Sequence, residues 1–405
     1  MKEELTATTK NYIKSTPLDH RKKMGQYFTP RSLRETLLEK LPKIENPKIL
    51  DPACGTGEFL LSSFELFNNP EVHGWELDPK LASLSEKKFP LAKIKKTNSL
   101  FESTEEQFDF VIGNPPYFEL KPTLEIQNIY GDILKGRTNI YSLFIYKGIQ
   151  LLKEGGYLAY IVPPSMNNGA YFTNLRDFII SQCDIEHLSV QYASDIFDGA
   201  SQSVMLLILK KGPNTGKYLF TKNNITIFSE KVKFLNESFR KATTLDELGY
   251  KVSTGSLVWN EHKEKLSTSE QNSTLLIWSK NITPNGLRLN NHNKPQYVKL
   301  MKYDIGPAIV VNRIVGQPGR GSLRAAIIPE GEKFIAENHV NVISRSPKKL
   351  LDSHGGQVLS FTKLLEQLNS SKQLEILQAI TGNSQISKTE LEKLFPIDLP
   401  ESTTP

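Results

Sequence analysis

The chain has little cysteine and no long apolar run. Of its 405 residues only Cys54 and Cys183 are cysteines, and their spacing matches neither a metal-binding motif nor a disulfide framework. Sparse cysteine is typical of proteins that work in a reducing cytoplasm. No apolar stretch approaches the roughly 20 residues that cross a bilayer, and no signal peptide is recognisable. We therefore expect a cytoplasmic protein that neither spans a membrane nor binds a structural metal.

A strong charge of either sign is also missing. The 50 Lys and Arg residues exceed the 44 Asp and Glu residues by only six, but the excess is unevenly distributed. Residues 213–405 contain 25 basic and 18 acidic residues, whereas residues 1–212 contain 25 and 26. The stretch 285–349 is the most basic. A polyanion is the partner that such a C-terminal half attracts, and the length allows two or three domains.

A glycine turn follows the first predicted strand. Lys48–Leu50 leads into residues 51–60, DPACGTGEFL, and the apolar residues after the turn predict a helix. Gly55 and Gly57 allow the backbone to pass close to a ligand. The turn does not match G-x-G-x-x-G and lacks a Walker lysine, so it gives little support to dinucleotide or phosphate binding.

An acid ends the second predicted strand, Val72–Leu77. In a nucleotide-binding fold an acid at this position binds the ribose hydroxyls, and Glu76 is our candidate. Asp78 is expected to cap a helix that begins at Pro79. A third strand near residues 92–96 leads to Asn98 and Ser99.

A stiff loop follows the fourth predicted strand. Phe108, Phe110, Val111 and Ile112 form a short apolar run, which stops at Gly113 and is followed by NPPY, residues 114–117. Two prolines restrict this loop. Asn114 and the Pro115 carbonyl can therefore be held as two acceptors beside the aromatic ring of Tyr117. An amino group on a planar ring has two hydrogens to donate, and the ring has a face that can stack on an aromatic side chain. It therefore matches two acceptors beside a tyrosine ring.

These segments resemble the motifs of the amino-methyltransferases, which methylate exocyclic or amide nitrogens with S-adenosyl-L-methionine. DPACGTG resembles motif I, and NPPY resembles motif IV. GQYFTP, residues 25–30, resembles motif X, which closes over the methionine end of the cofactor. Motif X at the N-terminus is the order of the gamma class. The chain is thus similar to gamma-class (TaqI-type) DNA adenine-N6 methyltransferases of type II restriction–modification systems.

The resemblance implies roles for individual residues. Asp51 would face the cationic methionine moiety, and Asn98, where relatives often carry an acid, would accept from the cofactor's adenine amino group. The implied cofactor-binding residues are Tyr27, Thr29, Pro30, Asp51, Ala53, Gly55, Gly57, Glu76, Asn98 and Ser99. The implied catalytic residues are Asn114, Pro115, Pro116, Tyr117 and Phe197. Phe197 would stack on the extruded adenine opposite Tyr117.

Strands alternate with helices through residue 210, which predicts a parallel sheet with helices on both faces. The resemblance implies a doubly wound, mostly parallel, seven-stranded Rossmann-like sheet in a catalytic domain of residues 1–212. We expect a mobile loop over residues 119–137, a helix that Pro30 opens, and a linker over 210–217. Residues 248–266 and 313–328 resemble segments of target-recognition domains. We therefore expect residues 213–405 to form an α+β DNA-binding domain, with Arg320 and Arg324 as candidate contacts.

The expected partner is double-stranded DNA in the nucleoid, bound by a monomer that works beside a separate cognate endonuclease. No covalent nucleophile is expected, because cytosine-C5 enzymes place Pro-Cys where this chain has Pro115-Pro116. The alternatives are an RNA adenine methyltransferase, a protein glutamine methyltransferase, or a DNA-specificity protein without catalysis. The basic half argues against a protein substrate and the intact motifs argue against loss of catalysis. RNA stays open.

Overall fold

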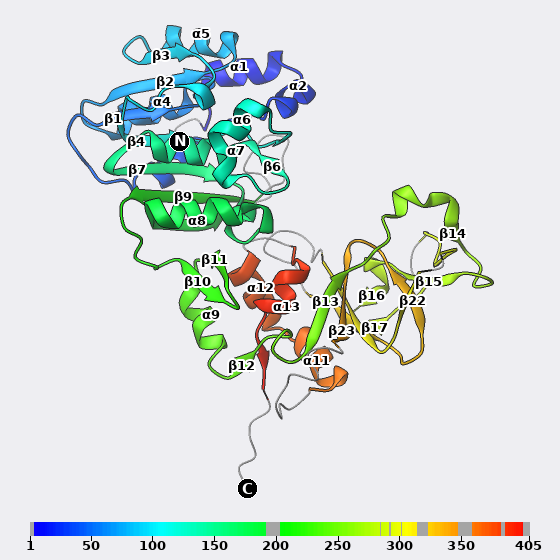
Figure 1. The fold of residues 1–405 in the computed structure, drawn as a ribbon. Helices are drawn as coiled ribbons and strands as arrows, with labels where there is room; N and C mark the ends of the chain where they lie inside the picture. The colour runs from blue at the N-terminus through cyan, green and yellow to red at the C-terminus, as the bar shows by residue number, and fades with distance from the viewer. Residues whose placement is uncertain are drawn as a thin grey trace. The chain divides into compact units, whose positions relative to one another are not determined.

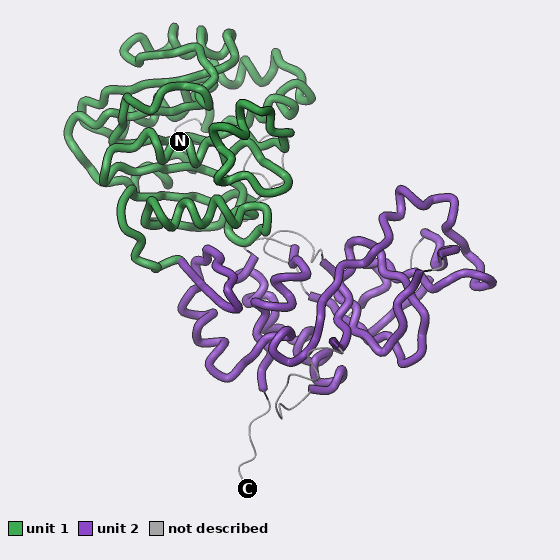
Figure 2. Tube along the Cα trace, viewed as in Figure 1, with its two compact units in different colours: residues 1–218 green, residues 219–405 purple. Residues whose placement is uncertain are grey.

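The computed structural model describes residues 4–191, 203–283, 285–290, 293–300, 302–313, 323–346, 359–381 and 385–399. The chain forms two compact units, residues 1–218 and 219–405, which we call the N-terminal and C-terminal units (Figure 2). The sequence placed a domain boundary at 212/213, and the structure divides the chain just beyond the predicted linker.

The N-terminal unit is built on one seven-stranded sheet with the order β3-β2-β1-β4-β7-β9-β8 (Figure 1). Adjacent strands from β3 to β7 are parallel, whereas β9 runs antiparallel to both of its neighbours. This confirms the predicted doubly wound, mostly parallel sheet. The strands are β1 Lys48–Asp51, β2 Glu71–Glu76, β3 Lys93–Lys96, β4 Phe108–Gly113, β7 Leu152–Val162, β8 Cys183–Gln191 and β9 Val204–Lys211.

Helices cover both faces of this sheet. Leu37 of α3 and Phe59 of α4 pack in one cluster with Ile112 of β4. Gly148 of α7 lies against the opposite face, next to Val111. Because successive side chains of a strand point to opposite faces, the apolar run of β4 is buried on both sides. The helices are α1 Ala7–Ser15, α2 Leu18–Lys23, α3 Arg31–Leu38, α4 Glu58–Leu66, α5 Pro79–Lys88, α6 Leu124–Tyr130, α7 Ile140–Gln150 and α8 Thr173–Gln182.

The expectation of a mobile loop over 119–137 is wrong, because helix α6 occupies its centre. The Thr123 side chain caps this helix by accepting from the Ile126 N–H at 3.3 Å. Tyr130 is fully buried, and its hydroxyl donates to the Leu100 carbonyl at 2.6 Å. This long-range contact anchors a helix whose apolar period is weak. The other short elements of the unit are η1 Ser99–Phe101, β5 Glu119–Leu120, η2 Gly131–Ile133, β6 Thr138–Asn139, η3 Pro164–Asn167 and η4 Ala170–Phe172.

The sequence predicted how helices α5 and α3 begin, and the structure shows both N-termini. Asp78 caps α5 as predicted, since its carboxylate accepts from the backbone N–H groups of Lys80 at 2.8 Å and Leu81 at 3.3 Å. Pro30 lies one position earlier than expected. It is the N-cap of α3, with extended backbone, and the helix begins at Arg31.

The C-terminal unit consists of small sheets, mostly antiparallel, and short helices. Strand order is β13-β23-β20-β21 in the four-stranded sheet and β14-β18-β15-β22-β19 in the five-stranded sheet. Among the described residues, a large core cluster packs Tyr250 and Ile309 of the first sheet with Leu364 and Phe395. Among the described helices of the chain, none has the length and apolarity needed to cross a membrane.

The elements of this unit are β10 Leu219–Lys222, β11 Ile225–Phe228, α9 Val232–Ser238, β12 Ala242–Thr243, β13 Tyr250–Thr254, η5 Trp259–Glu261, η6 Lys263–Lys265, β14 Leu266–Ser267, β15 Thr274–Ile277, η7 Ser279–Asn281, β16 Ile282–Thr283, β17 Gly286–Leu287, β18 Tyr297–Val298, β19 Asp304–Ile305, β20 Ala308–Asn312, β21 Ala325–Ile328, β22 Lys333–Ala336, β23 Val340–Arg345, α11 Phe361–Leu368, α12 Gln373–Thr381, α13 Lys388–Lys393 and β24 Ile397–Asp398. Strand β12 pairs with β24, so a segment from the first part of the unit lies beside its last described strand. The unit is therefore α+β.

Candidate active site

A pocket lies at the carboxyl edge of the large sheet. Strands β1, β2 and β4 are parallel, so Asp51, Glu76 and Asn114 meet there although they are far apart in sequence. Most of the residues singled out from the sequence line this pocket: Tyr27, Thr29, Asp51, Ala53, Gly55, Glu76, Asn98, Ser99, Asn114 and Pro116.

Five other residues singled out from the sequence lie elsewhere or are not described. Gly57 is the N-cap of α4, and Pro30 is the N-cap of α3. Pro115 is buried in the loop and Tyr117 is half-buried behind Asn114. Phe197 falls in residues 192–202, outside the described part of the chain.

Asp51 is held in a buried position at the end of β1. Its Oδ1 accepts from the Ala53 N–H at 3.0 Å. Gly113 makes room for the carboxylate, because a Cβ there would lie 2.8 Å from Asp51 Oδ1 and its φ is +147°. Burial raises the pKa of Asp51 to about 8, although the Ala53 N–H opposes the shift. A cation beside this carboxyl group would favour the charged form.

Glu76 connects β2 to the glycine turn. Its Oε2 accepts from the Gly55 N–H and its Oε1 from the Asp78 N–H, both at 2.8 Å. Burial raises the pKa of Glu76, and these hydrogen bonds oppose the rise. Because a carboxylate has about four acceptor sites, capacity for two hydroxyl donors remains.

The pair that follows β3 is engaged mainly in local contacts. Asn98 caps η1, with its Oδ1 accepting from the Leu100 N–H at 3.2 Å. The Ser99 hydroxyl donates to the Pro52 carbonyl at 2.5 Å and so ties this segment to the glycine turn. Any further acceptance by Asn98 uses the second lone pair of the same oxygen.

Hydrogen bonds fix the orientation of Asn114. Its Nδ2 donates to the Tyr27 carbonyl at 3.0 Å, and its Oδ1 accepts from the Tyr117 hydroxyl. That hydroxyl also contacts the Ile161 carbonyl at 2.6 Å. Burial raises the pKa of Tyr117 well above its ordinary value, so the hydroxyl stays a donor. The hydrogen bond to Tyr27 thus fixes which way the Asn114 amide faces, so that its oxygen acts as a hydrogen-bond acceptor.

The segment 25–30 packs directly on the NPPY loop. Gly25 has φ +64°, and a Cβ there would lie 2.8 Å from Pro116 Cβ. The rings of Tyr27 and Tyr117 stack with centroids 6.2 Å apart. The two motifs that resemble motif X and motif IV thus form one wall.

Sequence reasoning missed several lining residues, among them Phe28, Glu58, Phe118, Ile140 and Phe144. Glu58 and Phe118 directly follow two of the three recognised motifs, DPACGTG and NPPY, so adjacency was an available signal. Ile140 and Phe144 belong to α7, whose apolar period indicates only that the helix packs on the sheet. The N-terminal helices α1 and α2 were not foreseen either.

The pocket lining is acidic and aromatic. It includes Asp51, Glu58, Glu76 and Asp78, and within the described lining no Lys or Arg occurs. Such a pocket repels a phosphate or pyrophosphate group and attracts a cation. These residues fit S-adenosyl-L-methionine, which combines a nucleoside, an ammonium group and a sulfonium. Asp51 would hold the cationic end, and Glu76 would hold the ribose.

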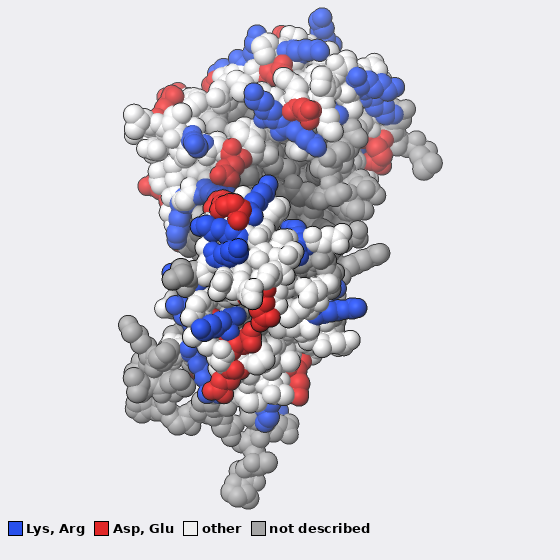
Figure 3. Space-filling view, turned by 90° about the vertical axis from the view of Figure 1, so that its right-hand side faces the viewer, with Lys and Arg blue, Asp and Glu red and all other residues white. Residues whose placement is uncertain are grey.

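In the C-terminal unit the basic residues are dispersed among acidic ones. On the face drawn in Figure 3, which includes both units, described Lys and Arg side chains are interspersed with Asp and Glu. Lys294 Nζ lies 4.0 Å from the Trp259 ring centroid and 4.4 Å from that of Trp278. Arg324 is exposed, whereas Arg320 lies outside the described residues.

The sheet order and the site define a class, the Rossmann-like methyltransferases that use S-adenosyl-L-methionine. The family model of Eco57I restriction-modification methylases matches residues 58–197. Type II methyltransferase M.CvrRI of Paramecium bursaria Chlorella virus XZ-6E is 30% identical over 324 residues, which cover 79% of this chain and 83% of the relative. The chain therefore belongs to the type II methyltransferases of restriction–modification systems.

Two further comparisons give similarities below 30% identity. Modification methylase CviBIII of Paramecium bursaria Chlorella virus NC1A is 28% identical over 347 residues, 84% of this chain and 88% of the relative. A solved Listeria monocytogenes structure assigned to the class I S-adenosylmethionine-dependent methyltransferases is 26% identical, with a TM-score of 0.43. It covers 51% of this chain and 65% of that chain. Family membership confirms the predicted cofactor, S-adenosyl-L-methionine.

Proposed function

We propose that the protein methylates N6 of an adenine flipped out of duplex DNA, as the modification enzyme of a restriction–modification system. The observation that carries the proposal is the Asn114 amide. Its nitrogen is committed to the Tyr27 carbonyl, and its oxygen is an acceptor beside the acidic pocket. An acceptor in this position matches an amino group that has hydrogens to donate.

The chemistry requires a better nucleophile than a free adenine amino group, because that lone pair is delocalised into the ring. Asn114 Oδ1 and the Pro115 carbonyl accept the two N6 hydrogens and favour a tetrahedral nitrogen with a free lone pair. S-adenosyl-L-methionine would supply the methyl group: its sulfur–methyl bond breaks as the nitrogen–carbon bond forms, S-adenosyl-L-homocysteine leaves, and the methylated nitrogen releases one proton to water. The residues of the loop contribute by positioning and by stabilising positive charge on nitrogen.

Extrusion of the base costs a few kcal/mol. Stacking contributes about 1–3 kcal/mol per aromatic contact, so Tyr117 and Phe197 together are of the right size to offset that cost. Since Asn114 Oδ1 already accepts from the Tyr117 hydroxyl, the base shares this oxygen with it or displaces the hydroxyl. A carbonyl oxygen has two lone pairs, which permits sharing.

The state of Cys54 supports methylation of a nitrogen rather than of a ring carbon. Cys54 is 5% exposed, and burial raises the pKa of its thiol well above the ordinary value. Its Sγ lies only 3.0 Å from the position of a Cβ on Gly74. A buried neutral thiol is a poor nucleophile, so this cysteine does not attack the base.

The division of labour is part of the proposal. Residues 1–212 bind the cofactor and carry out transfer, whereas the basic residues 213–405 bind the duplex and read its sequence. We further propose a monomer that acts beside an endonuclease on a separate chain. Sedimentation of the purified protein with and without duplex DNA tests the monomer.

The decisive test of substrate is tritiated methyl transfer from S-adenosyl-L-methionine to duplex DNA, RNA and a release-factor protein in parallel. Transfer to duplex DNA that greatly exceeds the other two supports the proposal. Transfer mainly to RNA or to protein replaces it with the corresponding alternative. No transfer to any substrate, with the cofactor still bound, indicates a DNA-specificity protein.

A further inference from the structure

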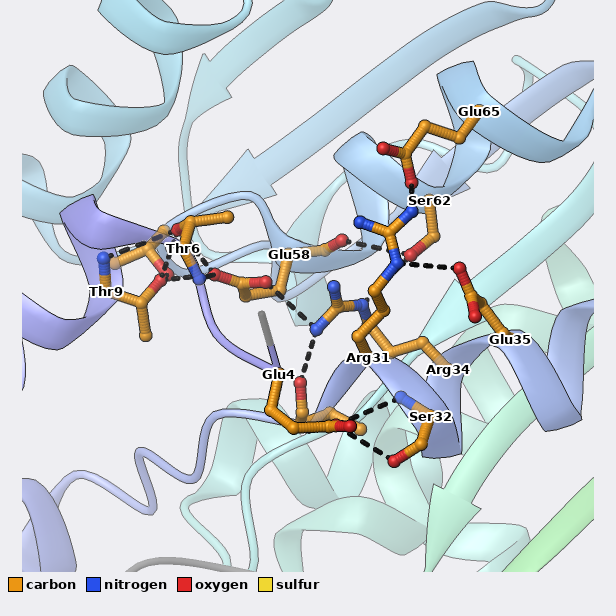
Figure 4. A network of polar contacts seen from close by, with 12 residues as sticks. Glu4, Thr6, Thr9, Arg31, Ser32, Arg34, Glu35, Glu58, Ser62 and Glu65 are labelled. Carbon is orange, nitrogen blue, oxygen red and sulfur yellow. Dashed lines mark hydrogen bonds and ion pairs between the residues drawn. The ribbon is translucent and has the colours of Figure 1, made fainter. Parts of the chain in front are cut away.

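Glu58 stands at the centre of a buried polar network beside the cofactor pocket (Figure 4). It is the first residue of α4 and is 4% exposed. Its Oε1 accepts from the Thr6 N–H at 3.1 Å, the Thr6 hydroxyl at 2.6 Å and the Thr9 hydroxyl at 2.5 Å. The carboxylate therefore fastens the beginning of α1 to the helix that follows the glycine turn.

Arg34 provides the opposite charge. It is 1% exposed, and its Nη1 forms an ion pair with Glu58 Oε2 at 2.9 Å. The same nitrogen donates to the Thr29 carbonyl, and Nε donates to the Ser62 hydroxyl at 2.9 Å. One guanidinium thus connects α3, α4 and a loop that lines the pocket. Burial lowers the pKa of Arg34, whereas the negative charge of Glu58 raises it. Removing Glu58 would therefore leave a buried guanidinium without its counter-charge.

The chain before the pocket, residues 4–24, which we call the N-terminal strap, is attached to this network through Thr6 and Thr9 and to neighbouring residues through Glu4 and Tyr12. Glu4 accepts from the Ser32 N–H at 3.1 Å and the Ser32 hydroxyl at 2.9 Å. Tyr12 donates to Gln26 Oε1 at 3.0 Å and packs edge-on against Phe28, with centroids 5.7 Å apart. Gln26 and Phe28 line the pocket. The strap therefore supports the wall that residues 24–29 form.

We propose that Arg34 and Glu58 are positioning residues for the cofactor: they lock the N-terminal strap and Thr29 in place, so that the wall is ordered before S-adenosyl-L-methionine arrives. A wall that is already ordered does not pay its ordering entropy on binding. The inference depends on the proposed function only through the cofactor pocket. Its primary measurements are cofactor affinity and strap order, which need no methyl acceptor, so failure of the proposed target base leaves them unaffected.

The principal variant is Glu58→Gln in the full-length chain. Glutamine keeps the shape and the Oε1 acceptor but leaves Arg34 buried without its counter-charge. We expect the dissociation constant for S-adenosyl-L-methionine to rise about tenfold or more. Hydrogen exchange without cofactor should accelerate over residues 4–24, and kcat at saturating cofactor should change less than about threefold. Trypsin should cleave faster after the exposed Lys14 and Lys22.

Two further variants separate positioning from general destabilisation. Glu35→Gln is the matched control, because it breaks the 2.7 Å pair with Arg31 on the same helix α3 without reaching the pocket. Its affinity and exchange should stay within about twofold of wild type. Arg34→Gln/Glu58→Gln removes both buried charges, so it should recover part of the affinity that Glu58→Gln loses.

If Glu58→Gln fails to fold, Thr9→Val takes its place. It removes one donor to Glu58 and leaves the ion pair intact, so the strap should loosen and affinity should fall about two- to fivefold. Unchanged cofactor affinity and unchanged exchange over residues 4–24 in the folded variant would overturn the proposal. A large fall in kcat with unchanged affinity would also overturn it, since Glu58 would then act in the chemical step.

Discussion

The two units of the chain arrange their polar residues in different ways. In the N-terminal unit, parallel strands bring Asp51, Glu76 and Asn114 to one edge of one sheet. The C-terminal unit has several small, mostly antiparallel sheets, in which neighbouring strands have their carboxyl ends at opposite edges. Its basic side chains are spread over many short elements. The topology of a parallel sheet concentrates a site that is scattered in sequence, whereas small antiparallel sheets do not.

This difference determines what each unit's sequence reveals. Motifs at the carboxyl ends of β1, β2 and β4 point to a single pocket and to its chemistry. In the C-terminal unit the sequence reveals a net charge, a property of the whole surface that assigns no residue to a base. We therefore propose named side chains for catalysis and only a region for recognition.

The largest expected effect follows from removing the acceptor in the N-terminal unit. Asn114→Ala should raise the activation free energy of methyl transfer by about 3–4 kcal/mol, by analogy with the loss of one oxyanion-hole donor. The single-turnover rate should therefore fall by a factor of about 10²–10³. Cofactor and DNA affinity should persist, because the lining acids and the C-terminal unit are untouched. Rapid-quench kinetics measure the rate.

The control for that variant is Tyr117→Phe. It removes the hydroxyl that donates to Asn114 Oδ1 but keeps the ring, so most of the rate should remain. Wild-type single-turnover rates in Asn114→Ala would remove this residue from the mechanism.

The second effect sharpens the contrast between the units. A chain that ends at Tyr218 retains the apolar core around Ile49, Phe110 and Leu206 and should still bind S-adenosyl-L-methionine. Its duplex affinity should fall about a hundredfold or more in low salt, because the basic half that displaces counterions is gone. Filter binding across a salt series should show a flatter slope. An equal slope with retained sequence specificity would place recognition in the N-terminal unit.

A third prediction concerns the ribose site. Glu76→Ala should weaken S-adenosyl-L-methionine binding by about 1–3 kcal/mol, through loss of a charged acceptor. Calorimetry measures the affinity directly. Glu71→Ala is the control, since Glu71 begins the same strand, is exposed and pairs with Lys93 away from the pocket. Equal affinity in the Glu76 variant and in wild type would assign the ribose contact to another residue.

The smallest effect, taken per pH unit, is the pH dependence that Asp51 imposes. Burial raises its pKa from 3.8 to about 8, so the folded protein without cofactor holds a proton that the unfolded chain has released. The stability due to this proton is complete below pH 3.8 and is lost as the pH rises to about 8. A bound cation favours the carboxylate, so cofactor affinity should rise up to about tenfold per pH unit below pH 8.

Calorimetry in two buffers with different ionisation enthalpies should detect the released proton. Asp51→Asn should lose this part of the pH dependence and keep the titrations of Glu76, whose pKa burial also raises, and of the cofactor's own amino group. An identical pH profile in wild type and Asp51→Asn would show that Asp51 is ionised without the cofactor.

Several features of the fold and site followed from the sequence because their signals are local. The apolar run 108–112 and the cap at Asp78 depend on neighbouring residues alone. Helix α6 was missed because the buried contact from Tyr130 to Leu100 stabilises it. Helix α1 was missed for the same reason, since Thr6 and Thr9 bind Glu58 about 50 residues away. Local periodicity carries no information about such contacts.

The central claim is that Asn114 and its loop methylate adenine N6 in duplex DNA. Mass spectrometry of nucleosides from a duplex incubated with the protein and S-adenosyl-L-methionine tests it most directly. The account predicts N6-methyldeoxyadenosine that appears with wild type and disappears with Asn114→Ala. A methylated cytosine in place of methylated adenine would contradict it.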